Sequence, residues 1–88
     1  MKRSVIAAMN KYKASWTTRH EVNSTIKQLK DKLELLQKTR NKELRNSKTE
    51  ADKAKVRSRY DDEIKYYDYL LYLINLEYYD IIGKLKNV

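Results

Sequence analysis

The 88-residue chain has no cysteine, no proline and only one glycine. Without cysteine it can form neither a disulfide nor a thiolate metal site, and this favours a reducing, cytoplasmic setting. Without proline, and with a single glycine, the sequence contains almost nothing that interrupts a helix. These absences predict an all-α protein with one helical domain over residues 1–88, because a chain of this length has material for only one core.

Residues suited to catalysis or metal binding are also scarce. His20 is the one histidine. It has no cysteine to act with, and one histidine is too few for a multi-histidine metal site. Asp61, Asp62 and Glu63 are consecutive, so on a helix their carboxylates point in different directions and do not converge on one ion. We therefore expect a protein that is not an enzyme and that uses no cofactor and no metal.

Long uncharged apolar runs are missing as well. The apolar run at residues 5–9 is too short for the core of a signal peptide. The more apolar stretch at residues 60–85 is long enough to span a bilayer, but it contains Asp68, Glu77 and Asp80, which are costly in hydrocarbon. The sequence therefore predicts no membrane partner.

The dominant pattern that is present lies between residues 60 and 85, where apolar side chains recur at alternating spacings of four and three. They are Tyr60, Ile64, Tyr67, Leu71, Ile74, Tyr78, Ile81 and Leu85. Such spacing is typical of a helix that presents one seam to a partner helix. Further apolar residues cover most of the remaining surface from residue 66 onward, so this helix must be covered on more than one side.

Three helices are predicted, over about residues 4–16, 19–46 and 50–82. The second helix starts at a capping box formed by Thr18 and Glu21, in which side chains satisfy backbone N–H groups at the helix start. Thr25 with Gln28 matches the same pattern seven residues later, so the helix could also begin there. We prefer the earlier start because the apolar seam that begins at Val22 runs across both candidates.

The ends of the third helix carry their own signals. Ser47 with Glu50 and Thr49 with Asp52 are both helix-start patterns, and they place the start near Glu50. Gly83 is well placed to end the helix in a left-handed conformation.

The short turn at residues 45–49 makes the second and third helices antiparallel neighbours, with Leu33 near Ile64. The first helix is too short to be stable alone, and we expect it to fold back over residues 78–85. The predicted fold is a long antiparallel helical hairpin, coiled-coil-like, with a short N-terminal helix packed against it.

The third helix carries more apolar surface than a hairpin and one short helix can hide. An exposed patch of this kind normally marks an interface, and tyrosine is enriched at binding hot spots. The predicted protein interface consists of Tyr66, Tyr69, Leu70, Tyr72, Leu73, Leu76 and Tyr79. It would serve a protein partner or a homo-oligomer. The alternative is a three-helix core in which the tyrosine hydroxyl groups simply reach water.

Charge is distributed unevenly along the chain. Residues 1–59 hold 17 Lys and Arg against 6 Asp and Glu, whereas residues 60–88 hold 3 against 6. Much of the excess surrounds the hairpin turn, in a cluster that we call the basic tip: Lys38, Lys42, Arg45, Lys48, Lys53, Lys55, Arg57 and Arg59. Such a cluster can contact phosphates or an acidic protein surface. It can also be a solvated face that maintains solubility.

The pattern contains no base-reading motif, and the tyrosines do not interleave with the basic residues. Any contact with nucleic acid should therefore be made to the backbone and be weakly sequence-specific. Two functions stay open at this point. The first is a helical binding protein that acts through the tyrosine-rich interface, as an inhibitor or accessory factor of a nucleic-acid-handling complex of the kind encoded by phages or mobile elements. The second is a sequence-tolerant DNA- or RNA-binding protein that uses the basic tip.

Overall fold

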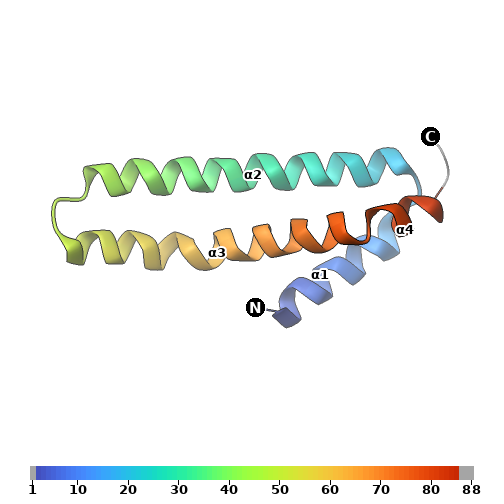
Figure 1. The fold of residues 1–88 in the computed structure, drawn as a ribbon, viewed down its shortest axis with the longest axis horizontal. Coiled ribbons are helices and arrows are strands. Elements are labelled where there is room, and N and C mark those ends of the chain that lie inside the picture. Colours follow the sequence, from blue (N-terminus) through green and yellow to red (C-terminus); the bar gives the residue numbers. More distant parts are fainter. Residues whose placement is uncertain (1, 86–88) are drawn as a thin grey trace.

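The structure, a computed structural model, describes residues 2–85 and consists of helices joined by short connections (Figure 1). The helices are α1 (Lys2–Ser15), α2 (Arg19–Asn46), α3 (Glu50–Leu76) and α4 (Tyr78–Gly83). The described residues include no β-strand. The predicted fold class, an all-α hairpin with a short N-terminal helix against it, is confirmed.

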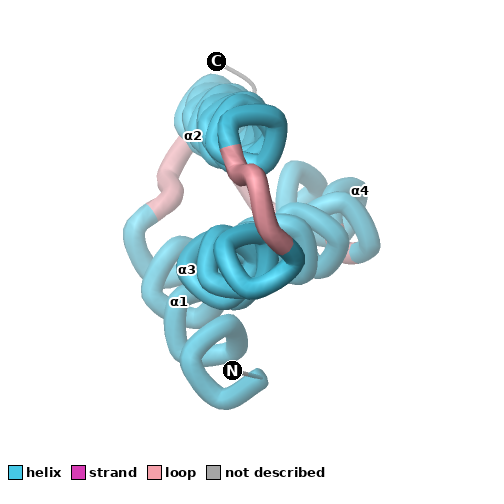
Figure 2. The backbone as a smooth tube through the Cα atoms, turned by 90° about the vertical axis from the view of Figure 1, so that its left-hand side faces the viewer, coloured by secondary structure: helices cyan, strands magenta, loops and turns pink. Residues whose placement is uncertain are grey.

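Helix α3 lies between α2 and α1, with α2 on one side and α1 on the other (Figure 2). The molecule is elongated, with principal extents of 52 × 24 × 17 Å and a radius of gyration of 16.0 Å. A compact domain of this length would have a radius of gyration of about 12 Å. A larger share of the chain is therefore near solvent than in a compact domain.

Contacts of α2 with α3 and then with α4 occur in reverse order along the chain, as an antiparallel hairpin requires. Near the turn, Arg59 Nη1 lies 2.8 Å from Glu43 Oε1. At the open end of the hairpin, the Tyr78 hydroxyl donates to Asn23 Oδ1 at 2.7 Å. Arg19 Nε donates to the Ile82 carbonyl oxygen at 3.2 Å and so satisfies a backbone group at the end of α4.

The N-terminal caps form as the sequence predicts. The Thr18 hydroxyl accepts a hydrogen bond from the Glu21 backbone N–H at 3.3 Å, and Thr49 caps α3 in the same way through Asp52 N–H at 3.1 Å. The Glu21 carboxylate in turn accepts from the Thr17 hydroxyl at 2.6 Å. This hydrogen bond from Thr17, helped by those from Thr18, lowers the pKa of Glu21.

The third helix is not continuous to residue 82 as predicted. Helix α3 ends at Leu76, and α4 begins at Tyr78 after an interruption at Glu77 (Figure 1). The hydrogen-bond ladder continues on both sides, since Glu77 N–H donates to the Leu73 carbonyl and Ile81 N–H to the Glu77 carbonyl. The interruption is therefore a local change of direction. It allows α4 to contact α1 and α2 at once.

The expectation for Gly83 is also wrong. No glycine among the described residues has a positive φ, and Gly83 is the last residue of α4. The helix is closed instead by Lys84, which has φ −97° and ψ −4° and donates its N–H to the Ile81 carbonyl. The helix therefore ends in a last turn with i to i−3 hydrogen bonds, and not at a glycine in the left-handed conformation.

The main apolar core lies at the open end of the hairpin, where all the helices meet. Its buried members are Val5, Met9, Trp16, Val22, Leu29, Leu70, Leu71, Ile74 and Ile81. Toward the turn, only Val56 and Ile64 are buried. Leu70 is 1% exposed, which corrects its predicted place on a solvent-facing interface. The reason is that α1 packs over this face of α3.

Replacing Leu70 by alanine should lower the free energy of unfolding by about 2–5 kcal/mol, because the side chain leaves a cavity where helices meet. Leu76→Ala is the matched control. Leu76 is 66% exposed, so its loss should change stability by no more than about 0.5 kcal/mol. Urea unfolding followed by circular dichroism measures both, and equal effects of the two substitutions would contradict the assigned core.

Glu21→Gln should reduce stability in a pH-dependent way. Because the folded-state pKa of Glu21 is lowered from its ordinary value of 4.5, ionised Glu21 stabilises the fold above that value, and the contribution is lost as the pH falls through the folded-state pKa. The difference in unfolding free energy between wild type and Glu21→Gln should therefore be largest near neutral pH and shrink in acid. Denaturant titrations across this range test it; a difference that stays constant with pH would contradict the role of the cap.

Candidate interaction surface

Three large apolar side chains on α3 and α4 remain in solvent after the helices have packed. Tyr72 is 59% exposed, Leu76 is 66% exposed and Tyr79 is 83% exposed. Tyr69, one turn earlier, is half-buried, and its ring stacks on that of Tyr72 with centroids 6.2 Å apart. These four residues follow one another at spacings of three, four and three, so they form one line along the helices. We call this line the outer stripe.

The other residues of the predicted interface face a different way. Tyr66 and Leu73 are half-buried and pack against the core, together with the buried Leu70. Residues at this spacing share one helix face, and α1 packs on α3 there. Of the seven predicted interface residues, the structure thus brings four together in the outer stripe and directs three toward α1.

Two charged side chains, Lys65 and Asp80, lie near the outer stripe. Lys65 is one turn before Tyr69, and Asp80 is one turn after Leu76, where it also lines the crevice between α1 and α4. Both are exposed, and neither forms an ion pair with another described residue. The sequence spacing predicts i,i+4 pairs of Lys65 with Asp61 and of Asp80 with Lys84. Neither pair is among the ion pairs of the described residues.

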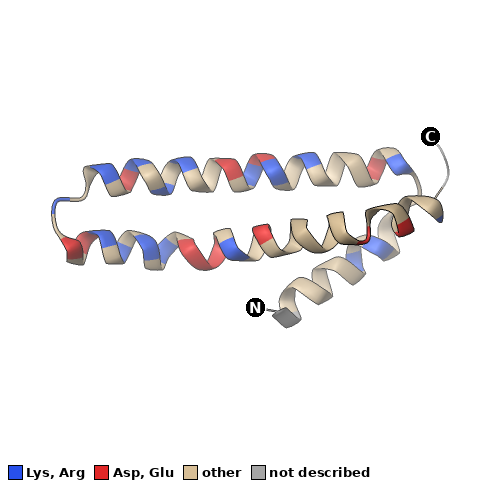
Figure 3. Ribbon diagram, in the orientation of Figure 1, with Lys and Arg blue, Asp and Glu red and all other residues tan. Residues whose placement is uncertain are grey.

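The basic tip forms at the hairpin turn, where α2 ends and α3 begins (Figure 3). Its eight residues are exposed except Lys53, which is half-buried. Lys53 lies 3.7 Å from Glu50, and Arg59 pairs with Glu43. Within the described part of the chain, the other six form no ion pair. These six cations are therefore available to an anionic partner.

A second ion pair between α2 and α3, besides Arg59–Glu43, lies close to the basic tip. Arg40 Nη1 lies 3.2 Å from Asp61 Oδ1, so it joins α2 to α3. A hydrogen bond with Glu43 raises the pKa of the nearby Tyr60 hydroxyl. Ion pairs and hydrogen bonds thus hold together the end of the molecule that has few buried apolar residues. Arg40, Glu43 and Asp61 are consequently structural, and we do not include them in the binding surface.

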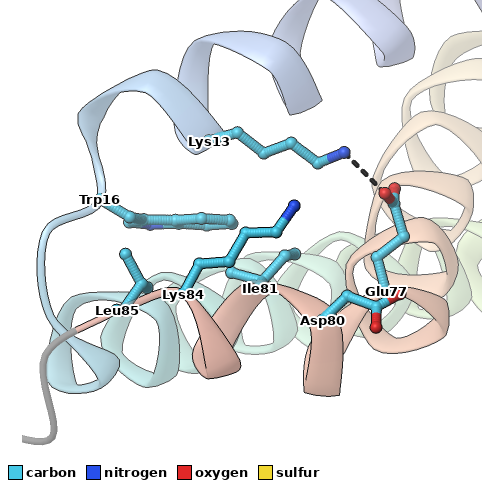
Figure 4. Close-up of a pocket in the computed structure, with 7 residues that line it drawn as sticks. All are labelled: Lys13, Trp16, Glu77, Asp80, Ile81, Lys84 and Leu85. Carbon is cyan, nitrogen blue, oxygen red and sulfur yellow. Dashed lines mark hydrogen bonds and ion pairs between the residues drawn. The ribbon is translucent and has the colours of Figure 1, made fainter.

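A crevice of about 200 Å³ lies between α1 and α4 (Figure 4). Trp16, Ile81 and Leu85 supply its apolar wall, while Lys13 Nζ lies 2.6 Å from Glu77 Oε1 at its rim. Typical ligand pockets are roughly 300–1,000 Å³, so this one is small for a cofactor. The shape of the crevice follows mainly from the packing of Trp16, whose indole N–H donates to the Thr25 hydroxyl at 3.1 Å.

Other candidate sites are limited. His20 is exposed on the first turn of α2. The described residues contain no group of three or more His, Cys, Asp or Glu side chains placed to hold a metal ion. In the same part of the chain, no helix has both the length and the apolar character that crossing a membrane requires.

Comparison with protein-family models, with curated proteins and with solved structures finds no match to this chain. Two surfaces of the molecule are therefore the candidates for function, the outer stripe and the basic tip. The basic tip lies at the hairpin turn (Figure 3), whereas the outer stripe extends from the C-terminal part of α3 into α4, toward the other end of a molecule 52 Å long.

Proposed function

We propose that this is a small, non-enzymatic helical binding protein whose outer stripe is a protein–protein interface. The observation that supports the proposal is the exposure of Tyr72, Leu76 and Tyr79 on consecutive turns, at 59%, 66% and 83%. Tyrosine combines a large apolar ring with a hydroxyl that can form hydrogen bonds, and it is over-represented at binding hot spots. A partner that covers the stripe removes this apolar surface from water.

Exposed apolar residues elsewhere on the molecule provide a comparison. Leu35 on α2 is 65% exposed and Ile6 on α1 is 52% exposed. Single exposed residues of this kind are normal on soluble proteins. The outer stripe differs because its four members are continuous over roughly 15 Å of helix, at 1.5 Å per residue, and two of the rings already stack on each other.

The basic tip supports a more specific role. Residues 38–59 hold nine Lys and Arg against three Asp and Glu. A protein held by its outer stripe would present this charge to phosphates or to an acidic surface on the same assembly. We infer an inhibitor or accessory factor of a nucleic-acid-handling complex, of the phage or mobile-element kind. The absence of cysteine supports a cytoplasmic setting for it.

A second candidate function is sequence-tolerant binding of DNA or RNA by the basic tip. It is favoured by the six exposed tip cations that form no ion pair with a described residue. Lys38, Lys42 and Arg45 follow one another on the outside of α2, while Lys55 and Arg57 are on α3. Cations on several sides of one end suit contact with a phosphate backbone and provide no geometry for reading bases.

A photo-cross-linking amino acid in place of Tyr79 should capture a protein in cells of the source organism, after nuclease treatment of the extract. The same amino acid in place of Leu35 is the matched control, because both positions are more than 60% exposed. Tyr72→Lys should abolish the product formed at position 79, since it places a charge in the middle of the stripe. Identical products at positions 79 and 35, or a product that Tyr72→Lys does not affect, would contradict the proposed interface.

The second candidate function predicts that duplex DNA of arbitrary sequence binds with an affinity that falls steeply with salt, as measured by fluorescence anisotropy. Lys42→Glu with Arg45→Glu should lower the slope of log affinity against log salt by about 2, close to one per lost phosphate contact. Lys27→Glu with Lys30→Glu, on α2 but away from the tip, changes the net charge equally and should have a smaller effect. Equal effects of both pairs would show that only net charge matters.

A further inference from the structure

The basic tip carries cations on both helices of the hairpin (Figure 3). On α2, Lys38, Lys42 and Arg45 follow one another at spacings of four and three, so they lie on one face of the helix. Arg40 and Glu43, which pair with α3, are each two residues away from a member of this row. Two residues correspond to a rotation of about 200° around a helix. The three cations, which we call the α2 row, therefore face away from α3.

Carboxylates are scarce around the α2 row. Neighbours on a helix surface are three and four residues apart, and at these spacings Lys42 and Arg45 have only Lys, Arg, Asn and Thr. Lys38 has Glu34 four residues before it, but the two form no ion pair in the described part of the chain. All three cations of the row are exposed. The row is therefore a continuous line of positive charge.

The exposed cations of α3 that form no ion pair with a described residue are arranged differently. Lys55 lies three residues after Asp52, and Arg57 lies four residues before Asp61. Each thus has a carboxylate one turn away, which lowers the positive potential around it. Lys55 and Arg57 are also two residues apart, so they lie on nearly opposite sides of α3. A straight partner cannot contact both, whereas it can contact the whole α2 row.

We propose that the α2 row binds double-stranded DNA along the phosphates of one strand, and that Lys55 and Arg57 do not take part. This rests on the second candidate function, because it names the form of nucleic acid that the basic tip binds and the face that binds it. The row extends over roughly 10 Å of helix, at 1.5 Å per residue. One strand of duplex DNA presents a phosphate about every 3.4 Å along the axis, so the row covers about three phosphates.

The residues near the row favour a duplex over a single strand. Proteins bind single strands largely by stacking bases on aromatic rings, and residues 17–59 contain no Tyr, Trp or Phe. The next aromatic residue, Tyr60, is half-buried and lies under the Arg59 guanidinium at 6.0 Å. A duplex keeps its bases inside and offers its phosphates. Its persistence length of about 50 nm keeps it straight across the row, so it contacts one side of the tip.

The absence of apolar surface beside the row favours DNA over an acidic protein. A protein interface combines an apolar core with few charged residues. The large apolar side chains that are exposed in the described part of the chain are Ile6, Leu35, Tyr72, Leu76 and Tyr79. None of them lies between residues 38 and 59, where the chain offers charge alone. Duplex DNA, with one negative charge per roughly 1.7 Å of its axis, is the partner that such a surface fits.

Two charge-neutralising pairs in the full chain test which face binds, with fluorescence anisotropy of a labelled DNA duplex over a series of salt concentrations. Lys42→Gln with Arg45→Gln should lower the slope of log affinity against log salt by about 2, since two phosphate contacts are lost. Lys55→Gln with Arg57→Gln removes the same charge from the same tip and should lower it by less than about 1. Circular dichroism checks that both variants fold.

Two further ligands test which partner binds. The single strand of the same sequence should bind the wild type about tenfold more weakly than the duplex, because the tip provides no ring for stacking. Poly-glutamate at the same concentration of charge should displace the labelled duplex less completely than unlabelled duplex does. A single strand that binds as tightly as the duplex would overturn the proposal, and so would equal displacement by poly-glutamate, which would assign the row to acidic proteins.

The failure of this inference differs from the failure of the function on which it rests. If the wild type binds the duplex and the two pairs of substitutions lower the salt slope equally, the basic tip binds DNA without a preferred face, and only the assignment to the α2 row is wrong. If the wild type shows no salt-dependent binding of the duplex, the second candidate function fails and this inference fails with it. The cross-linking at position 79 is independent of both results.

Discussion

The packing of α1 against α3 is the contact on which the rest of this structure depends. Helix α1 has 14 residues, too few to be stable alone in water, and it forms by burying Val5 and Met9, which are 0% and 3% exposed. In doing so it covers the side of α3 that contains Leu70. An apolar helix with three sides to cover then has one side on α2, one on α1 and one left over. The outer stripe is therefore a consequence of where α1 docks.

The apolar core and the ion pairs that join α2 to α3 lie at different ends of the molecule. The open end of the hairpin holds nearly all the buried apolar side chains, whereas the turn end is held by caps and by the pairs Arg59–Glu43 and Arg40–Asp61. Partly exposed ion pairs contribute little individually. The basic tip should consequently open locally more easily than the core, and a tip that adapts its shape would suit the contact with phosphates that we propose.

The features that could be predicted from the sequence are those set by local chemistry. The caps at Thr18 and Thr49 need only a hydroxyl and a backbone N–H three residues away, and both form. The α2–α3 seam could be predicted because its spacing extends over many turns. The interruption at Glu77 could not, because no glycine, proline or other local pattern marks it in the sequence. For the same reason, two neighbouring apolar faces of α3 looked equivalent, and the sequence did not distinguish the buried Leu70 from the exposed Tyr72.

The burial and stacking of Trp16 affect the fluorescence of the protein. It is the one tryptophan in a chain with eight tyrosines, it is 5% exposed, and its ring stacks on Tyr12 with centroids 5.6 Å apart. Tyrosine excitation transfers readily to a nearby indole, so excitation of Tyr12 is emitted mainly from Trp16. The emission maximum of this buried indole then reports whether the N-terminal helix is docked, and the protein carries an intrinsic fluorescent reporter of the contact on which its architecture depends.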